Sequence, residues 1–154
     1  MRNFLILCVL TLSLAGCKST ERGALDPDTL AKKLFDAVRS EAVDKSALLL
    51  PDKGTYRKIE AENGREPADL NAAYEAFTGN AQAAFSAAFN ATAKWDEATF
   101  TRANYTESKL EKLPIAHVTT KFLIAQEPHK FEFTAVKFNN RWYYYGDILW
   151  VDKP

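Results

Sequence analysis

The side chains that could carry acid–base chemistry lie mainly in the C-terminal part of the chain. Asp147 follows Gly146 inside an aromatic stretch, and a partly buried carboxylate there could serve as a general base, because burial moves its pKa toward neutrality. Tyr144 and Tyr145 lie on opposite faces if this stretch is a strand, so one of their hydroxyls could line a pocket. The alternative interpretations are a strand-end hydrogen bond for Asp147 and core packing with a bonded hydroxyl for the two tyrosines.

The two histidines and Glu132 fit catalysis less well. His117 alternates with apolar residues such as Val118, which indicates the solvent-facing side of a strand. His129 follows Pro128 in a predicted turn and is expected to be exposed, and Glu132 stands between two phenylalanines and should face away from the core. The sequence has no metal-spaced histidine pair, no glycine-rich phosphate loop and no Gly-x-Ser-x-Gly motif. We therefore expect no catalytic residue set, no bound metal and no cofactor.

The charge balance argues against two classes of partner. The chain has 20 basic and 20 acidic side chains. A domain that binds nucleic acid usually has a basic excess, and a polybasic membrane segment has clustered lysines and arginines. Neither pattern is found in the sequence, so we expect no nucleic-acid partner.

The N-terminus has the three-part pattern of a secretory signal. Met1-Arg2-Asn3 supplies one positive charge, an apolar run follows from Phe4 to Ala15, and a small residue precedes Cys17. The apolar run is too short to span a bilayer stably, since that takes roughly 20 residues. The alternative is an ordinary secretory signal, or a short membrane helix, that happens to end in a cysteine.

The tetrapeptide Leu14-Ala15-Gly16-Cys17 resembles the lipobox of bacterial lipoproteins. The resemblance implies that residues 1–16 are a signal peptide and that Cys17 carries a diacylglycerol thioether, which anchors the protein to a membrane. We then expect residues 17–25 to be the lipidated cysteine and a tether, and residues 26–154 to form a single domain in the cell envelope.

Two further expectations follow from this resemblance. Lys18 is not aspartate, which among sorted lipoproteins implies the periplasmic face of the outer membrane in a diderm species, and otherwise the outer face of the cell membrane. Cys8 leaves with the signal and Cys17 is lipidated, so the mature domain has no thiol for a disulfide, for redox chemistry or for zinc.

The first half of the domain has the pattern of helices. Asp26-Pro27-Asp28 is a helix start, because Asp26 can cap the helix and Pro27 suits its first turn, and apolar residues then recur at helical spacing from Leu30 to Val38. A short second helix is expected over 43–50, before Pro51. Segment 52–64 is ambiguous between a loop and a helical turn.

A long helix is predicted from about Pro67 to Ala93 by one apolar stripe. Its many alanines allow close approach to a broad partner, such as a sheet, and a coiled-coil partner is the competing interpretation. The stripe consists of Leu70, Tyr74, Phe77, Ala81, Ala84 and Ala88.

The rest of the chain alternates as strands do. The expected elements are strands over 99–105, 115–126 and about 130–135, a turn at Glu127-Pro128-His129, a two-residue hairpin turn at Asn139-Asn140, and a last strand over Arg141–Val151. Both faces of the last strand carry bulky side chains. This pattern indicates either a central strand or one whose outer face is also covered.

Helices followed by antiparallel strands give an α+β order, and here it resembles the NTF2-like (SnoaL-like, cystatin-like) superfamily. The residues that carry the resemblance are Leu30–Leu50 and the closing hairpin Phe131–Tyr143, followed by Gly146-Asp147-Ile148. The resemblance implies N-terminal helices packed on a curved antiparallel sheet of three to four strands that forms a cone. It is also compatible with a homodimer through the sheet faces.

The leading functional hypothesis is a non-enzymatic binding domain for a small apolar ligand or an envelope protein. Trp142, Tyr144, Asp147 and Trp150 are the expected contact residues, since large aromatic side chains offer rigid contact area. One alternative is an enzyme of isomerase, dehydratase or hydrolase type that uses Asp147 with Tyr144 or Tyr145. Another is a structural or inhibitory interaction protein.

Overall fold

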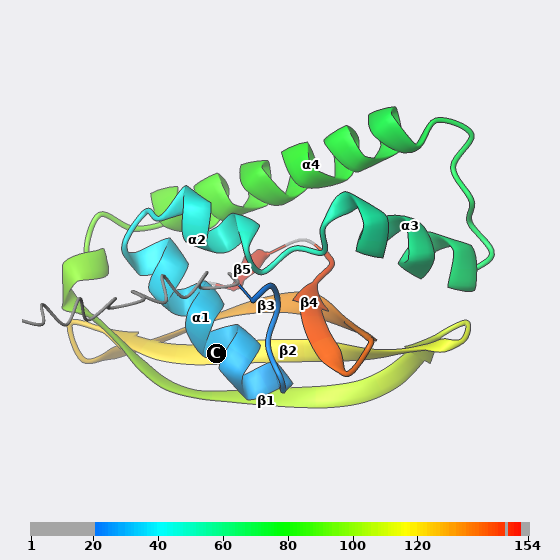
Figure 1. The fold of residues 1–154 in the computed structure, drawn as a ribbon. Helices are drawn as coiled ribbons and strands as arrows, with labels where there is room; N and C mark the ends of the chain where they lie inside the picture. Colours follow the sequence, from blue (N-terminus) through cyan, green and yellow to red (C-terminus); the bar gives the residue numbers. More distant parts are fainter. Residues whose placement is uncertain (1–20, 147, 152–154) are drawn as a thin grey trace, which may run out of the picture.

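The computed structural model describes residues 21–146 and 148–151, and within them the chain folds as α+β (Figure 1). The helices are α1 (Pro27–Arg39), α2 (Val43–Ala47), α3 (Lys53–Glu62) and α4 (Leu70–Asn90), followed by a 3-10 turn at Trp95–Glu97. The strands are β1 (Ala98–Leu110), β2 (Leu113–Ile124), β3 (Glu127–Phe138), β4 (Arg141–Tyr144) and β5 (Leu149–Val151). No helix in this part of the chain is long and apolar enough to cross a membrane. The predicted signal peptide and Cys17 lie outside the described residues.

The strands form one antiparallel sheet that curves around α1, which confirms the predicted class (Figure 1). β1, β2, β3 and β4 are hydrogen-bonded in that order, and β5 pairs with β3 as well. The single last strand expected over Arg141–Val151 is therefore divided, and the sheet has five strands instead of three to four. The chain bends at Gly146, which lies so close to Thr134 that an added Cβ would come within 3.1 Å of the Thr134 Cβ.

The main core fills the space between α1 and the inner face of the sheet. Asp26 caps α1 as predicted, since its side chain accepts a hydrogen bond from the Thr29 backbone N–H at 2.7 Å. The Phe35 ring packs against Phe122 with ring centroids 5.3 Å apart. The β2 residues on the face of Val118, which was predicted to lie opposite the solvent-facing His117, are all buried: Ala116, Val118, Thr120, Phe122 and Ile124.

A second apolar cluster covers the opposite face of the sheet and explains why the last strand is bulky on both sides. Trp142 and Tyr144 belong to the main core, whereas Tyr143 between them packs with Val136 and with Ile59 of α3. The ambiguous segment 52–64 is thus mostly helix, and its Ile59 is fully buried. β4 is not a central strand of the sheet. Its outer face is covered instead, which was the second of the two predicted possibilities.

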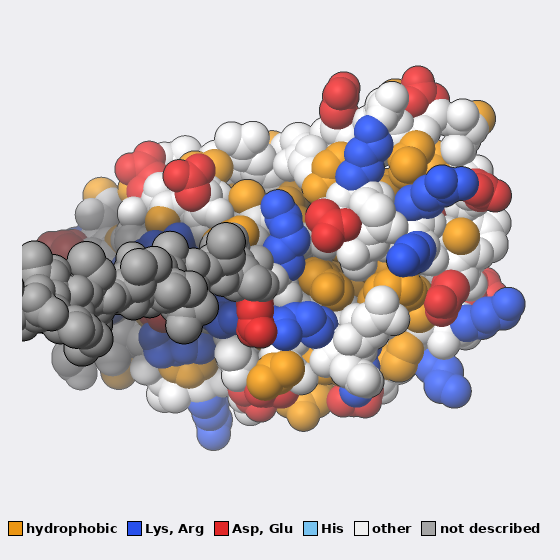
Figure 2. Space-filling model, in the orientation of Figure 1, with side chains coloured by type: hydrophobic (Ala, Val, Ile, Leu, Met, Phe, Trp, Pro, Cys, Tyr) orange, Lys and Arg blue, Asp and Glu red, His pale blue; other side chains and the backbone are white. Residues whose placement is uncertain are grey.

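Helix α4 packs mainly on the other helices and not on the sheet. It crosses above α1, α2 and α3, and its main contact with the sheet is with β5 (Figure 1). The predicted stripe does face inward: Ala81 and Ala88 are buried, and Phe77 and Ala84 pack against the core. On the face shown in Figure 2, acidic and basic side chains are interspersed.

One hairpin turn was predicted correctly and another was placed wrongly. Asn139 and Asn140 have φ of 48° and 60°, as the predicted two-residue turn requires. The preceding turn lies at Ala125 and Gln126, with φ of 50° and 71°, and not at Glu127-Pro128-His129. His129 is consequently a β3 residue, half-buried, with its ring 6.0 Å from that of Phe122, and is not exposed in a turn.

Candidate functional site

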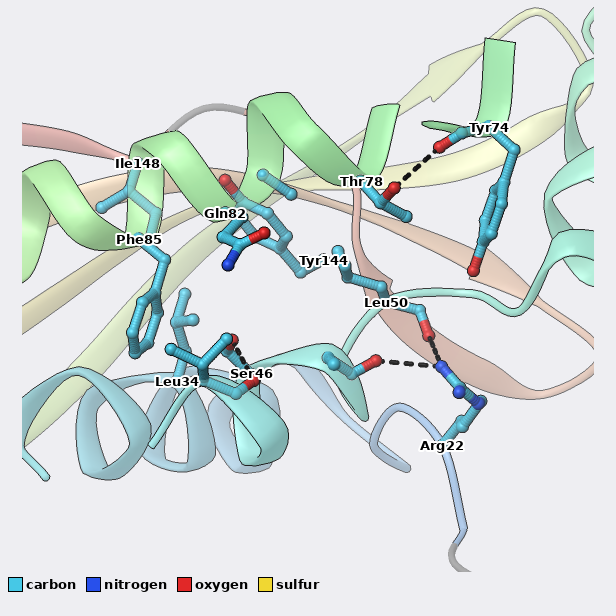
Figure 3. A pocket seen from close by; sticks show the side chains of 13 residues that line it. Arg22, Leu34, Ser46, Leu50, Tyr74, Thr78, Gln82, Phe85, Tyr144 and Ile148 are labelled. Carbon is cyan, nitrogen blue, oxygen red and sulfur yellow. Dashed lines mark hydrogen bonds between the residues drawn. The ribbon is translucent and has the colours of Figure 1, made fainter. Parts of the chain in front are cut away.

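A cavity of about 160 Å³ lies beneath α4, between that helix, α1, α2, Tyr144 of β4 and Ile148 (Figure 3). Its walls are mainly apolar, because the inward stripes of α1 and α4 meet there without filling the space. The lining residues are Arg22, Leu34, Val43, Ser46, Ala47, Leu50, Tyr74, Thr78, Ala81, Gln82, Phe85, Tyr144 and Ile148.

Arg22 brings a positive charge to this cavity. Its Nη1 donates to the Ala47 carbonyl at 2.9 Å and to the Leu50 carbonyl at 3.4 Å (Figure 3). These two contacts fix the guanidinium at one end of the cavity, while the described residues provide no hydrogen-bond acceptor for its Nε and Nη2. A guanidinium with free N–H groups is suited to a carboxylate or phosphate oxygen.

Of the other polar side chains that line the cavity, some are held by hydrogen bonds to backbone carbonyls and one reaches into the open space. The Tyr74 hydroxyl donates to the Pro51 carbonyl at 3.1 Å, and burial raises the pKa of Tyr74, an effect that the charge of Arg22 partly offsets. The Thr78 hydroxyl donates to the Tyr74 carbonyl at 3.0 Å. The amide of Gln82 projects from α4 into the same space (Figure 3). The described lining therefore combines apolar walls with the cation of Arg22 and the amide of Gln82.

The expected contact residues do not converge on one site. Tyr144 lines the cavity, as the binding hypothesis requires. Trp142 is 3 % exposed and pairs through its backbone with Ala24, with the Lys137 ammonium 5.7 Å from its ring centroid. Trp150 packs at a different place, with its ring 5.6 Å from that of Trp95. The fourth, Asp147, lies outside the described residues.

Arg22 was not predicted as a site residue, because it stands in the segment interpreted as a tether. In the structure Ala24 is fully buried, its backbone bonds in both directions with Trp142, and the Gly23 N–H donates to the Leu48 carbonyl at 2.8 Å. The end of that segment thus packs on the domain. No local pattern signals this, because the backbone partners Leu48 and Trp142 lie far away in the chain.

A buried acid lies outside the cavity, between α3 and the end of β4. Glu60 is only 8 % exposed and accepts a hydrogen bond from the Tyr145 hydroxyl. Burial raises the pKa of the Glu60 carboxyl, and the positive charge of Arg65, whose Nε is 3.6 Å away, offsets part of that rise. The predicted bonded hydroxyl of Tyr145 is confirmed. His117, also as predicted, is exposed.

The described residues contain no group of three or more His, Cys, Asp or Glu side chains that could hold a metal ion. Comparisons with protein-family models, with curated proteins and with solved structures gave no match.

Proposed function

We propose that this chain is a lipid-anchored envelope protein whose domain binds a small, mainly apolar ligand, without catalysis, in the cavity beneath α4. The cavity is the observation that carries the proposal. Its described lining contains no carboxylate and no imidazole, so the enzymatic alternative depends on Asp147 together with Tyr144 or Tyr145.

The size of the cavity sets the size of the ligand. Apolar cavities of about 150 Å³ in other proteins stay dry and bind benzene or xenon. A cavity of about 160 Å³ thus suits one ring or a short branched chain, and not a full acyl chain. Arg22 at one end favours a ligand that carries an anionic substituent, and Gln82 adds hydrogen-bonding capacity.

The anchor places this cavity close to a membrane. Arg22 is five positions after Cys17 (22 − 17 = 5), and five extended residues reach at most about 18 Å. A diacylglycerol thioether on Cys17, with a further acyl chain on its amino group in some species, would hold the domain firmly. The location we propose is the periplasmic face of the outer membrane in a diderm species, and otherwise the outer face of the cell membrane.

Membership of the NTF2-like superfamily is part of the proposal. The curvature of the sheet around a helix supports it. The enclosed helix, however, is α1 with 13 residues, while the 21-residue α4 lies outside and α3 covers the opposite face of the sheet. A homodimer through sheet faces would have to use the part of the outer face that α3 leaves open.

Native mass spectrometry of the full chain, extracted from its membrane fraction in an uncharged detergent, tests both halves of the proposal. We expect a chain that begins at Cys17 with the mass of a diacylglyceryl group, and a second population heavier by one small molecule. An unprocessed or unlipidated chain contradicts the anchor. A lipidated chain that never carries a small molecule, even after incubation with a library of small aromatic acids, contradicts the binding role.

A further inference from the structure

Three cations lie side by side on the outer face of the sheet. The register pairs Arg102 of β1 with Lys121 of β2, and Lys121 with Lys130 of β3. Directly paired residues of antiparallel strands have Cβ atoms about 5 Å apart and point to the same face. Lys121 is therefore flanked by a positive charge on each side.

Within the described residues, an ion pair neutralises only one of these three positive charges. The Lys130 ammonium is 3.2 Å from a carboxylate oxygen of Glu132, whereas Arg102 and Lys121 have no ion pair among residues 21–146 and 148–151. Like charges directly opposite each other destabilise a sheet. The positive charges in this row repel one another, and a bound anion would reduce that repulsion.

The row borders a groove of about 340 Å³ that has apolar walls as well as charge. Leu123 and Pro128, which pair with each other, lie two residues beyond Lys121 and two before Lys130 on the same face. Thr101 lies at a β-bulge, where the register shifts between Phe100 and Arg102, and it also borders the groove. Bulges redirect side chains and are frequent next to binding sites.

We propose that this groove is a second ligand site, which binds a phosphate group through Lys121, Arg102 and Lys130. The apolar pair Leu123–Pro128 would take up a hydrophobic part next to that phosphate. The phosphate can belong to a soluble molecule or to the headgroup of an anionic lipid. This site depends neither on the cavity beneath α4 nor on the lipid at Cys17.

The test is an NMR titration of the full chain in uncharged detergent micelles. Inorganic phosphate is added in one arm, and micelles doped with phosphatidylglycerol or phosphatidylcholine are used in two others. We expect saturable shifts of the backbone amides of residues 101, 102, 121 and 130 with phosphate, with phosphatidylglycerol, or with both. Response to phosphate alone assigns a soluble ligand, and response to phosphatidylglycerol but not phosphatidylcholine assigns a headgroup.

Lys121→Gln separates this site from general charge attraction, and Lys112→Gln in the exposed β1–β2 turn is the matched control. The first substitution should weaken binding roughly tenfold or more, because it removes a charge-assisted hydrogen bond. Without phosphate it should also raise the midpoint of thermal unfolding by about 1 to 4 °C, since the like-charge conflict is removed. Lys112→Gln should change neither.

The proposal is overturned if neither phosphate nor phosphatidylglycerol shifts these amides. It is also overturned if chloride at equal ionic strength gives the same shifts, or if Lys121→Gln binds as tightly as the unchanged chain.

Discussion

The hydroxyl of Tyr145 donates a hydrogen bond to the carboxylate of Glu60, which lies 85 positions earlier in the chain. This contact joins the end of β4 to α3, the helix that covers the outer face of the sheet. The carboxylate is buried, so its hydrogen-bond donors matter more than they would at the surface.

Tyr145→Phe should lower the free energy of unfolding by about 1 to 3 kcal/mol, because it leaves a buried carboxylate without that donor. Urea unfolding followed by tryptophan fluorescence measures the change. The matched control is Tyr105→Phe, since Tyr105 is 42 % exposed on β1 and should have an effect near zero. Equal effects of the two substitutions would show that the buried contact contributes nothing.

The buried Glu60 also predicts a pH dependence. Its pKa in the folded protein is raised by burial above the ordinary value of 4.5, so the folded state binds the proton more tightly than the unfolded state. Its contribution to stability is therefore complete below pH 4.5 and is lost as the pH rises from there through the raised folded pKa.

Glu60→Gln should remove this part of the pH dependence. The difference in free energy of unfolding between Glu60→Gln and the unchanged chain should move in favour of the glutamine variant between pH 4.5 and neutrality. Glu62→Gln is the control, because Glu62 is exposed on the same helix. A Glu60→Gln difference that stays constant across this pH range would contradict the expectation.

The β2–β3 turn should be strained, since Ala125 and Gln126 both have positive φ. For residues other than glycine and asparagine this conformation costs about 1 to 2 kcal/mol. The double substitution Ala125→Asn and Gln126→Gly should stabilise the protein by about 1 to 2 kcal/mol in chemical denaturation. Lys112→Gly, at a turn residue with ordinary φ, should give no gain. A double variant no more stable than the unchanged chain would refute the strain.

Cys17→Ala should abolish incorporation of radiolabelled palmitate and release the protein from the membrane fraction, because it removes the site of the thioether. Cys8→Ala is the matched control, since Cys8 lies within the predicted signal peptide and should leave the label unchanged. Label that persists in Cys17→Ala would place the lipid elsewhere.

Local patterns in the sequence were sufficient for much of the fold. The cap at Asp26, the inner face of β2 and the turn at Asn139-Asn140 are decided by neighbours within a few residues. The turn at Ala125 was missed because neither of its residues is a turn former. The break between β4 and β5 was missed because Gly146, where the chain bends, lies against Thr134, a neighbour that is distant in the sequence.

The candidate sites were less predictable because they are assembled from distant segments. Tyr144 was identified from its place in an aromatic stretch, but Arg22 bonds to carbonyls 25 and 28 positions away. The cations of the outer face are separated by 19 and 9 residues (121 − 102 and 130 − 121), so no cluster is visible along the chain. Only the strand register brings Arg102, Lys121 and Lys130 together.

The cavity beneath α4 is the centre of the proposed function, and blocking it is the most direct test. Ala81 is buried in its wall, whereas Ala83 is exposed on the other side of the same helix. We therefore compare binding of 4-fluorobenzoate, a ring with one carboxylate, by fluorine NMR line broadening in the unchanged chain, in Ala81→Leu and in Ala83→Leu, with thermal unfolding as a check that each variant is folded. Our account predicts saturable binding by the unchanged chain and by Ala83→Leu, and none by Ala81→Leu. Absence of binding in all three, or equal binding in all three, would contradict it.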